Sequence, residues 1–194
     1  MNKGIYSRGY LPHWDFKNAT QGITFRLADS VPMTLVKQWR RELLDLRDEQ
    51  SRQKELHQRI ARYEDLGHGD AFLIRADCSD ALQQTLTGGH PDRYRLIDWC
   101  IMPNHVHVLI QINEGSNLGG IIRSWKGTSS FIINGQLGRT GPLWQREYHD
   151  RLVRDLNHFQ NCRAYIRNNP VKAKLCEKPE DWKFSSAGMG WSAE

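Results

Sequence analysis

The chain has 194 residues, of which 39% are hydrophobic and seven are tryptophan, and its formal net charge is +5. This composition excludes an intrinsically disordered segment, and the length is sufficient for a single domain with a sizeable core. The sequence has no run of 18 apolar residues and no apolar leader after Met1, so we expect a cytoplasmic protein without a membrane span. The four cysteines lack zinc-like spacing and are expected to be reduced thiols.

The first third of the chain predicts an arm, a strand and a helical excursion. Residues 1–20 are aromatic-rich and irregular, and this arm either packs on the body or, around Tyr10 to Trp14, stacks on bases. Residues 22–28 alternate as a strand does. After the break at Pro32, a helical tract is predicted from Met33 to about Leu66, dense in both charges beyond Arg47. We interpret it as a solvated excursion of one 1–194 domain, and not as a second domain.

The remaining elements predict a small sheet with helices. A helix over 78–86, with Ser79 as a plausible cap, precedes a hairpin of two strands, 94–102 and 104–110. A helix over 118–134, an extended piece over 143–154 and a last helix from Leu156 to about Asn169 follow. Asp155 is a suitable cap for that last helix, and Pro170 is expected to end it. This order indicates an α+β fold in which helices cover a small, mainly antiparallel sheet.

The second strand of the hairpin contains a His-x-His pair. Successive side chains on a strand point to opposite faces, so His105 and His107 share one face while Val106 and Val108 share the other. Imidazoles spaced about 7 Å along a strand can converge on one cation. Taken alone, such a pair is more often structural than metal-binding, so the spacing leaves both readings open.

Two polar residues of the last helix are further candidates. Tyr165 and Asn169 lie one helical turn apart at the edge of its apolar stripe. Each has an ordinary structural explanation, the tyrosine as a packing residue and the asparagine as a helix-end residue. Phosphate-binding loops, nucleophile elbows and zinc-finger patterns do not occur in the sequence.

Positive charge is concentrated in the second half of the chain. Residues 1–99 contain 15 Lys and Arg against 14 Asp and Glu, whereas residues 123–174 contain 10 against 3, a surplus of seven. Such a surplus favours a polyanionic partner such as nucleic acid, although an ordinary solvated surface would fit the composition equally well.

The ordered combination of these segments resembles the single-tyrosine HUH transposases, and among them the REP-associated tyrosine transposases. The resemblance rests on Pro103-Asn-His-Val-His-Val, on Trp144-Gln-Arg-Glu-Tyr-His-Asp, on Tyr165-Ile-Arg-Asn-Asn-Pro-Val-Lys172 and on the Asp181-Trp-Lys-Phe-Ser-Ser186 tail. It implies a ferredoxin-like α+β fold and a metal-dependent enzyme that cleaves and rejoins single-stranded, hairpin-flanked DNA through a 5′-phosphotyrosine intermediate.

Residue by residue, the resemblance assigns the metal pair to His105 and His107 and the nucleophile to Tyr165. Asn169 takes the position of the third metal ligand, where some branches of the family have glutamine. The implied cofactor is Mg²⁺ or Mn²⁺, and the implied partner is single-stranded or hairpin DNA, bound by a monomer or a homodimer.

Eight cations between residues 123 and 172 are candidates for phosphate contacts, which would make DNA binding fall steeply with salt. They are Arg123, Lys126, Arg139, Arg146, Arg151, Arg154, Arg167 and Lys172. Trp125, Trp144 and Tyr148 could stack on bases, although we expect them to pack in the core. Two other functions stay open, a non-catalytic nucleic-acid binder of the same fold and a hydrolytic single-strand nuclease.

Overall fold

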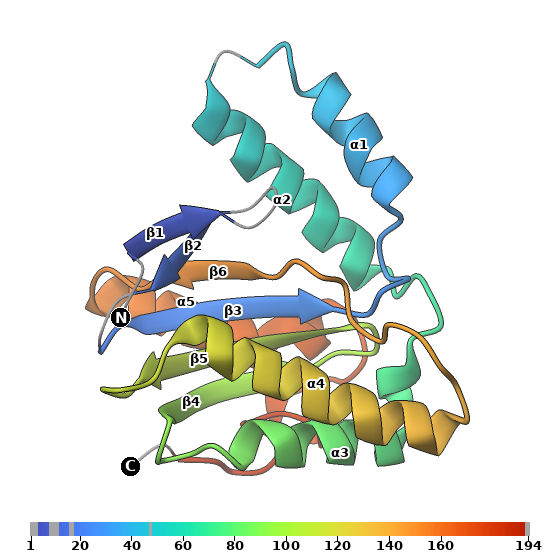
Figure 1. Ribbon diagram of the computed structural model, residues 1–194, viewed down its shortest axis with the longest axis vertical. Coiled ribbons are helices and arrows are strands. Elements are labelled where there is room, and N and C mark those ends of the chain that lie inside the picture. Colours follow the sequence, from blue (N-terminus) through green and yellow to red (C-terminus); the bar gives the residue numbers. More distant parts are fainter. Residues whose placement is uncertain (1–3, 8–11, 16–17, 47, 193–194) are drawn as a thin grey trace.

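A four-stranded antiparallel sheet lies at the centre of the computed structural model, which describes residues 4–7, 12–15, 18–46 and 48–192 (Figure 1). The strand order is β4-β5-β3-β6. The strand bounds are Thr20–Arg26 for β3, Tyr94–Ile101 for β4, His105–Ile112 for β5 and His149–Leu152 for β6.

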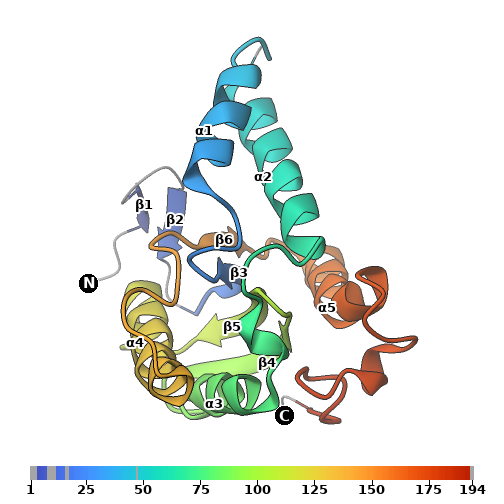
Figure 2. The ribbon, with the colours of Figure 1, turned by 90° about the vertical axis from the view of Figure 1, so that its right-hand side faces the viewer.

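The connections of this sheet follow the ferredoxin-like pattern. Helical segments join β3 to β4 and β5 to β6, while β4 and β5 form a hairpin. Helices α3 (Ala76–Thr87) and α4 (Leu118–Leu137) cover one face, and α5 (Leu156–Lys172) lies on the other (Figure 2). The predicted α+β, ferredoxin-like class is confirmed.

The main hydrophobic core lies between the sheet and the pair α3 and α4. Val106 and Val108 of β5 point into it and are fully buried, together with Trp99 of β4 and Trp125 of α4. Trp144 and Tyr148 are also buried, so the expectation that these aromatic residues pack in the core is confirmed. Because side chains alternate along β5, His105 and His107 point to the opposite face of the sheet, as the sequence predicted.

The charged tract after Pro32 forms two helices where one continuous tract was expected. Helices α1 (Met33–Glu42) and α2 (Glu49–Asp65) rise side by side from the sheet (Figures 1 and 2). Asp48 caps α2 by accepting a hydrogen bond from the Ser51 N–H at 2.7 Å. The two helices enclose a small apolar cluster of their own, which consists of Val31, Val36, Leu43, Leu56 and Ile60.

Three predicted boundaries are wrong. Part of the supposedly irregular arm is regular, since β1 (Gly4–Ser7) and β2 (Pro12–Asp15) form a two-stranded antiparallel sheet. Tyr10, proposed to stack on bases, lies outside the described residues. Helix α3 begins at Ala76, so Ser79 is not its cap; the Ser79 hydroxyl instead donates to the Leu73 carbonyl inside the core.

The third wrong boundary concerns Pro170, which does not end α5. The helix continues to Lys172, and the Ala173 N–H donates to the Asn169 carbonyl at 2.9 Å. Proline removes one backbone donor, but the N–H groups of Lys174 and Leu175 also bond to carbonyls of the last turn and hold it together. As a consequence, Asn169 lies within the helix, and its side chain is buried against the sheet.

Two short 3₁₀ helices complete the fold, η1 (Phe72–Ile74) and η2 (Pro179–Asp181). The four cysteines are free thiols, as expected. Among the described residues, no helix combines the length and the apolar character that crossing a bilayer requires.

Candidate active site

The two histidines of β5 lie side by side on the sheet face that carries α5. His105 and His107 are almost fully buried, with 1% and 5% of their surfaces exposed, and their Nε2 atoms are 3.0 Å apart. Cross-strand pairing places Arg26 opposite His105 and Thr24 opposite His107 on β3. The strand therefore brings both imidazole nitrogens to one point, as its alternation predicted.

The Nδ1 atom of each imidazole is held by a neighbouring side chain. The Asn104 amide donates to the carbonyls of Glu64 and His68, and these bonds fix its Oδ1 toward His105 Nδ1, 2.7 Å away. Since an amide oxygen only accepts, His105 carries its proton on Nδ1, and Nε2 presents a lone pair. His107 Nδ1 lies 2.8 Å from the Thr24 hydroxyl, which can either donate or accept.

Both imidazoles are neutral at physiological pH. Burial, with a smaller effect of the Arg26 guanidinium, lowers the pKa of His105 to about 3. Burial also lowers the pKa of His107 well below its ordinary value, and the neighbouring His105 and His57 act in the same direction. Neutral imidazole is the form that binds metals, so the pair is ready to act as a ligand.

Helix α5, which carries Tyr165 and Asn169, lies on the same face of the sheet as this pair. The Tyr165 ring lies edge-on to the His107 ring, with centroids 5.3 Å apart, and 43% of the Tyr165 surface is exposed. Partial burial raises the pKa of its phenol, and the nearby Asn169 amide offsets part of that effect. Asn169 is 1% exposed, and within the described part of the chain neither of its amide atoms makes a hydrogen bond of normal geometry.

The orientation of α5 is set by Asp98, which the sequence did not single out. Its fully buried carboxylate accepts hydrogen bonds from Arg163 Nε at 2.5 Å and from Arg167 Nε at 2.8 Å. The hydroxyl of Ser186, in the C-terminal tail, donates to the same carboxylate at 2.8 Å. Because Arg163 and Arg167 flank Tyr165 by two residues on either side, this cluster fixes the part of α5 that carries the phenol.

A buried ion pair borders the histidines on the β3 side. Arg26 Nη1 lies 2.6 Å from Glu64 Oε1, and the two side chains are 2% and 4% exposed. Burial raises the pKa of Glu64 to about 7, and Arg26 counteracts this only in part. The guanidinium therefore keeps positive charge next to the imidazole pair, where a phosphate would be favoured.

The family model described as "Transposase IS200 like" matches residues 73–169. That range is 97 of the 194 residues and contains both histidines, Tyr165 and Asn169. The chain belongs to the IS200-like transposase family. The resemblance read from the motifs is thereby confirmed at the level of the family.

The chain is also similar to two individual proteins, one of which is named as a transposase. The chain is 33% identical over 105 residues to a Haemophilus influenzae protein named "Putative REP-associated tyrosine transposase". It is 27% identical over 100 residues to a second, uncharacterised protein of that organism. These matches cover 49% and 40% of this chain and only 60% and 54% of the relatives.

A solved structure shares the fold over nearly the whole chain. It is described as a REP-associated tyrosine transposase bound to a REP hairpin. The superposition has a TM-score of 0.56 at 17% identity and covers 95% of this chain and 82% of the other. The likeness at this identity supports the fold, including the ferredoxin-like sheet.

The residues of this family member fit a divalent ion. Two nitrogens bound at about 2.1 Å and at right angles around an octahedral ion lie about 3.0 Å apart, which is the Nε2 separation found here. The unpartnered Asn169 amide offers an oxygen, the kind of ligand that Mg²⁺ and Mn²⁺ accept. Among the described residues, no group of three His, Cys, Asp or Glu could hold a metal.

Of the eight cations predicted to contact phosphate, three are engaged by other groups of the protein. Lys126 is half-buried and donates to the carbonyls of Gln145, Arg146 and Glu147, so a phosphate contact is not supported there. Burial lowers the pKa of Lys126 to about 7. Arg167 is engaged by Asp98, and Lys172 by Asp65 at 3.2 Å.

The other predicted contacts are more open. Arg139 lies over the Phe72 ring, 4.8 Å from its centroid. Arg123, Arg146, Arg151 and Arg154 are exposed, with Arg123 on α4, on the opposite side of the sheet from Tyr165. Their contacts with DNA stay predictions.

Proposed function

We propose that the protein is a transposase that cleaves and rejoins single-stranded DNA with Tyr165 as the nucleophile. The observation that carries the proposal is the contact, in one chain, of Tyr165 with the His105–His107 pair; the unpartnered Asn169 amide lies one turn further along the same helix. Membership of the IS200-like family supports it, and so does the similarity to a protein solved with a REP hairpin. We infer that hairpin-flanked DNA is the substrate.

In the proposed reaction the Tyr165 oxygen attacks the phosphorus of the scissile phosphodiester. The new O–P bond replaces the bond to the 3′ oxygen, which leaves as a 3′-hydroxyl after taking a proton, while the phenol proton passes to solvent. A later attack by a 3′-hydroxyl reverses these steps and releases the tyrosine. No external energy source is required, because the phosphotyrosine conserves the energy of the phosphodiester.

We infer that His105, His107 and Asn169 would hold Mg²⁺ or Mn²⁺ beside the scissile phosphate. Such an ion, when bound, would supply Lewis-acid stabilisation of charge on the phosphate oxygens. Asn104 and Thr24 orient the two imidazoles, and Arg26 adds fixed positive charge. Since Tyr165 contacts His107 of the same subunit, the proposed site can be formed within one subunit.

The test is the formation of a covalent adduct. A labelled hairpin oligonucleotide with a single-stranded flank is incubated with the protein and Mn²⁺, and adducts are separated on a denaturing gel. Adduct is expected with the unmodified chain, none with Tyr165→Phe and none in EDTA. Tyr63→Phe is the matched control, because this tyrosine contacts Trp39 and His68 away from the histidine pair and should leave the adduct unchanged.

Two results would contradict the proposal. Cleavage with many turnovers and no adduct would indicate a hydrolytic nuclease that uses activated water. Binding that is unaffected by EDTA and by substitution of His105, with no cleavage under any condition, would indicate a non-catalytic nucleic-acid binder. An adduct that persists in Tyr165→Phe would show that another residue is the nucleophile.

A further inference from the structure

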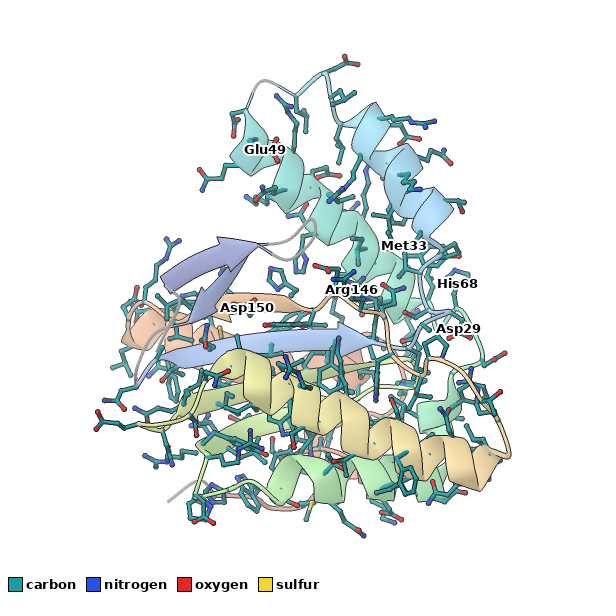
Figure 3. The ribbon with its side chains drawn as sticks, in the orientation of Figure 1. Asp29, Met33, Glu49, His68, Arg146 and Asp150 are labelled. Carbon is teal, nitrogen blue, oxygen red and sulfur yellow. The ribbon has the colours of Figure 1, made fainter. Side chains whose placement is uncertain are left out.

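A basic cavity separates the helical hairpin of α1 and α2 from the edge strand β6. It is open to solvent and has a volume of about 850 Å³. Glu49, at the outer end of α2, and Asp150, on β6, lie on its lining, and both are labelled in Figure 3. We call this space the α2–β6 cavity. The hairpin that forms one of its walls is additional to the ferredoxin-like pattern of strands and helices.

The lining of the α2–β6 cavity is predominantly cationic. Of the described residues that line it, six are cations and two, Glu49 and Asp150, are carboxylates, and the cations come from β3, α1, α2, β6 and the segment after β6. Lys54, Arg151 and Arg154 are exposed, and none of the three forms an ion pair within the described ranges. The six are Arg26, Arg40, Arg52, Lys54, Arg151 and Arg154. Such a groove attracts a phosphate backbone.

Aromatic rings lie on the inner wall of the same cavity. His57 of α2 stacks on His149 of β6 with ring centroids 3.8 Å apart, and each side chain keeps some exposed surface. Burial lowers the pKa of His57 to about 4, with the Arg26 and Arg151 guanidinium groups acting in the same direction. Neutral imidazoles among cations provide surfaces on which nucleobases can stack.

The cavity and the candidate active site lie next to each other on one face of the sheet. Thr24 of β3 pairs with His107 on one side and with His149 on the other, so these three side chains form a row on one face. Neighbouring strands lie about 4.8 Å apart, which places the His149 backbone about 10 Å from that of His107. One or two nucleotides would bridge that distance.

We propose that the α2–β6 cavity binds the single-stranded DNA that adjoins the scissile phosphate. A cavity of about 850 Å³ is in the size range of drug-sized ligand sites and has room for about two or three nucleotides, but not for a duplex. The proposal rests on the proposed transposase function and assigns the α1–α2 hairpin a role in it: the hairpin forms the wall that confines the strand.

A footprint on the unmodified protein is the first test. Lysines are acetylated with and without a saturating unstructured ten-nucleotide DNA strand, in EDTA to prevent chemistry, and are quantified by mass spectrometry. Lys54 should be protected severalfold, whereas Lys37, which is exposed on α1 and does not line the cavity, should react equally in both samples. Equal modification of Lys54 with and without DNA would overturn the proposal.

Equilibrium binding of a charge-neutralised variant is the second test. The triple variant Lys54→Gln, Arg151→Gln, Arg154→Gln is measured in a Tyr165→Phe background with EDTA, so that no adduct forms. Removing one cation that binds a phosphate of a single strand reduces affinity roughly fivefold at 0.1 M salt, and removing three gives roughly 100-fold. The logarithmic salt slope should also fall by about 2.

The matched control removes the same number of charges elsewhere. Lys37→Gln, Lys178→Gln, Lys183→Gln changes three exposed lysines outside the cavity and should bind within threefold of the parent. A cavity variant that binds as tightly as this control would overturn the proposal, and so would a stronger effect on a matched duplex than on the single strand. Loss of the Tyr165 adduct with intact cavity binding would instead refute only the proposed chemistry.

Discussion

Replacing Asp98 by asparagine tests how α5 is held in place. The variant keeps the size of the side chain but removes the charge from a fully buried carboxylate that accepts bonds from Arg163 and Arg167. A hydrogen bond to a charged group contributes about 1.5–3 kcal/mol. Because the two arginine side chains are 40% and 34% exposed, we take the lower value for each and expect a loss of about 3 kcal/mol.

A loss of this size is readily measured. In a protein of this length, 1 kcal/mol corresponds to about 2–4 °C in the melting temperature, so the variant should melt about 6–12 °C lower. Circular dichroism melts report the temperature, and urea titrations report the free energy of unfolding. Asp80→Asn is the matched control, because Asp80 is 45% exposed and lies 3.9 Å from Lys183; it should change the melting temperature by less than 2 °C.

The same variant should impair the reaction more than the fold. At 20 °C, where the variant is still folded, adduct formation by Tyr165 should slow at least tenfold, because the helix segment between Arg163 and Arg167 is no longer fixed. Affinity for single-stranded DNA should remain unchanged in the same samples. A shift of less than 2 °C together with a normal rate of adduct formation would refute the assignment of Asp98 as the anchor of α5.

Two further predictions concern the metal site and pH. In Asn169→Ala, Mn²⁺ affinity measured by electron paramagnetic resonance should fall at least tenfold. The metal-free protein should keep or gain stability, because a buried amide without partners is removed. A clear loss of stability with unchanged Mn²⁺ affinity would show that the amide is structural. His57 has a pKa lowered to about 4 in the folded state, so between pH 6.5 and 4 the unfolded chain holds a proton that the folded chain lacks, and stability falls as the pH falls through this window. Glu64, with a pKa raised to about 7, has the opposite effect on stability between pH 4.5 and 7. The contribution of His57 is therefore isolated by comparing the unmodified protein with a variant that changes His57 alone. His57→Gln should therefore reduce the slope of unfolding free energy against pH by about one proton in urea titrations at pH 5 to 6, and an unchanged slope would contradict the assigned shift.

The sequence predicted the elements that obey simple periodicity. The alternation of β5 separated His105 from Val106 correctly, and the helical spacing placed Tyr165 and Asn169 one turn apart on α5, where Tyr165 contacts His107. Asp155 was identified as the cap of α5, and it accepts from the His158 N–H at 2.7 Å. These predictions depend on local geometry, which a strand or a helix imposes on any sequence.

Asp98 could not be predicted by the same rule. Alternation from Tyr94 and Leu96 assigns it to the apolar face of β4, but the register shifts between Leu96 and Asp98. After the irregularity Asp98 pairs with Leu109 and lies on the α5 side. The sequence does show an acidic residue within an apolar strand and two arginines four residues apart on a later helix. Their pairing can be inferred only when this strand and this helix are known to be in contact.

For the α1–α2 hairpin and for Lys126, charge composition alone did not predict what the charged side chains contact. A tract rich in both charges predicted a solvated excursion, yet its inner surface forms a wall of the α2–β6 cavity. The basic surplus made Lys126 a candidate phosphate contact, whereas its ammonium group donates to three carbonyls before β6. Composition gives the number of charges in a segment, and only the tertiary contacts distinguish those that face a ligand from those that hold the fold.

The two faces of the sheet divide stability and chemistry between them. The face toward α3 and α4 is closed by apolar side chains, among them Phe25 and Val108, and supplies most of the hydrophobic stabilisation. The opposite face buries imidazoles, an ion pair and the amide of Asn169, groups that cost free energy when they lack full partners. A face built for stability alone would contain none of them. The Asn169 amide, buried and unpartnered on the face that carries the histidine pair, is therefore consistent with the proposal that this face binds a charged ligand.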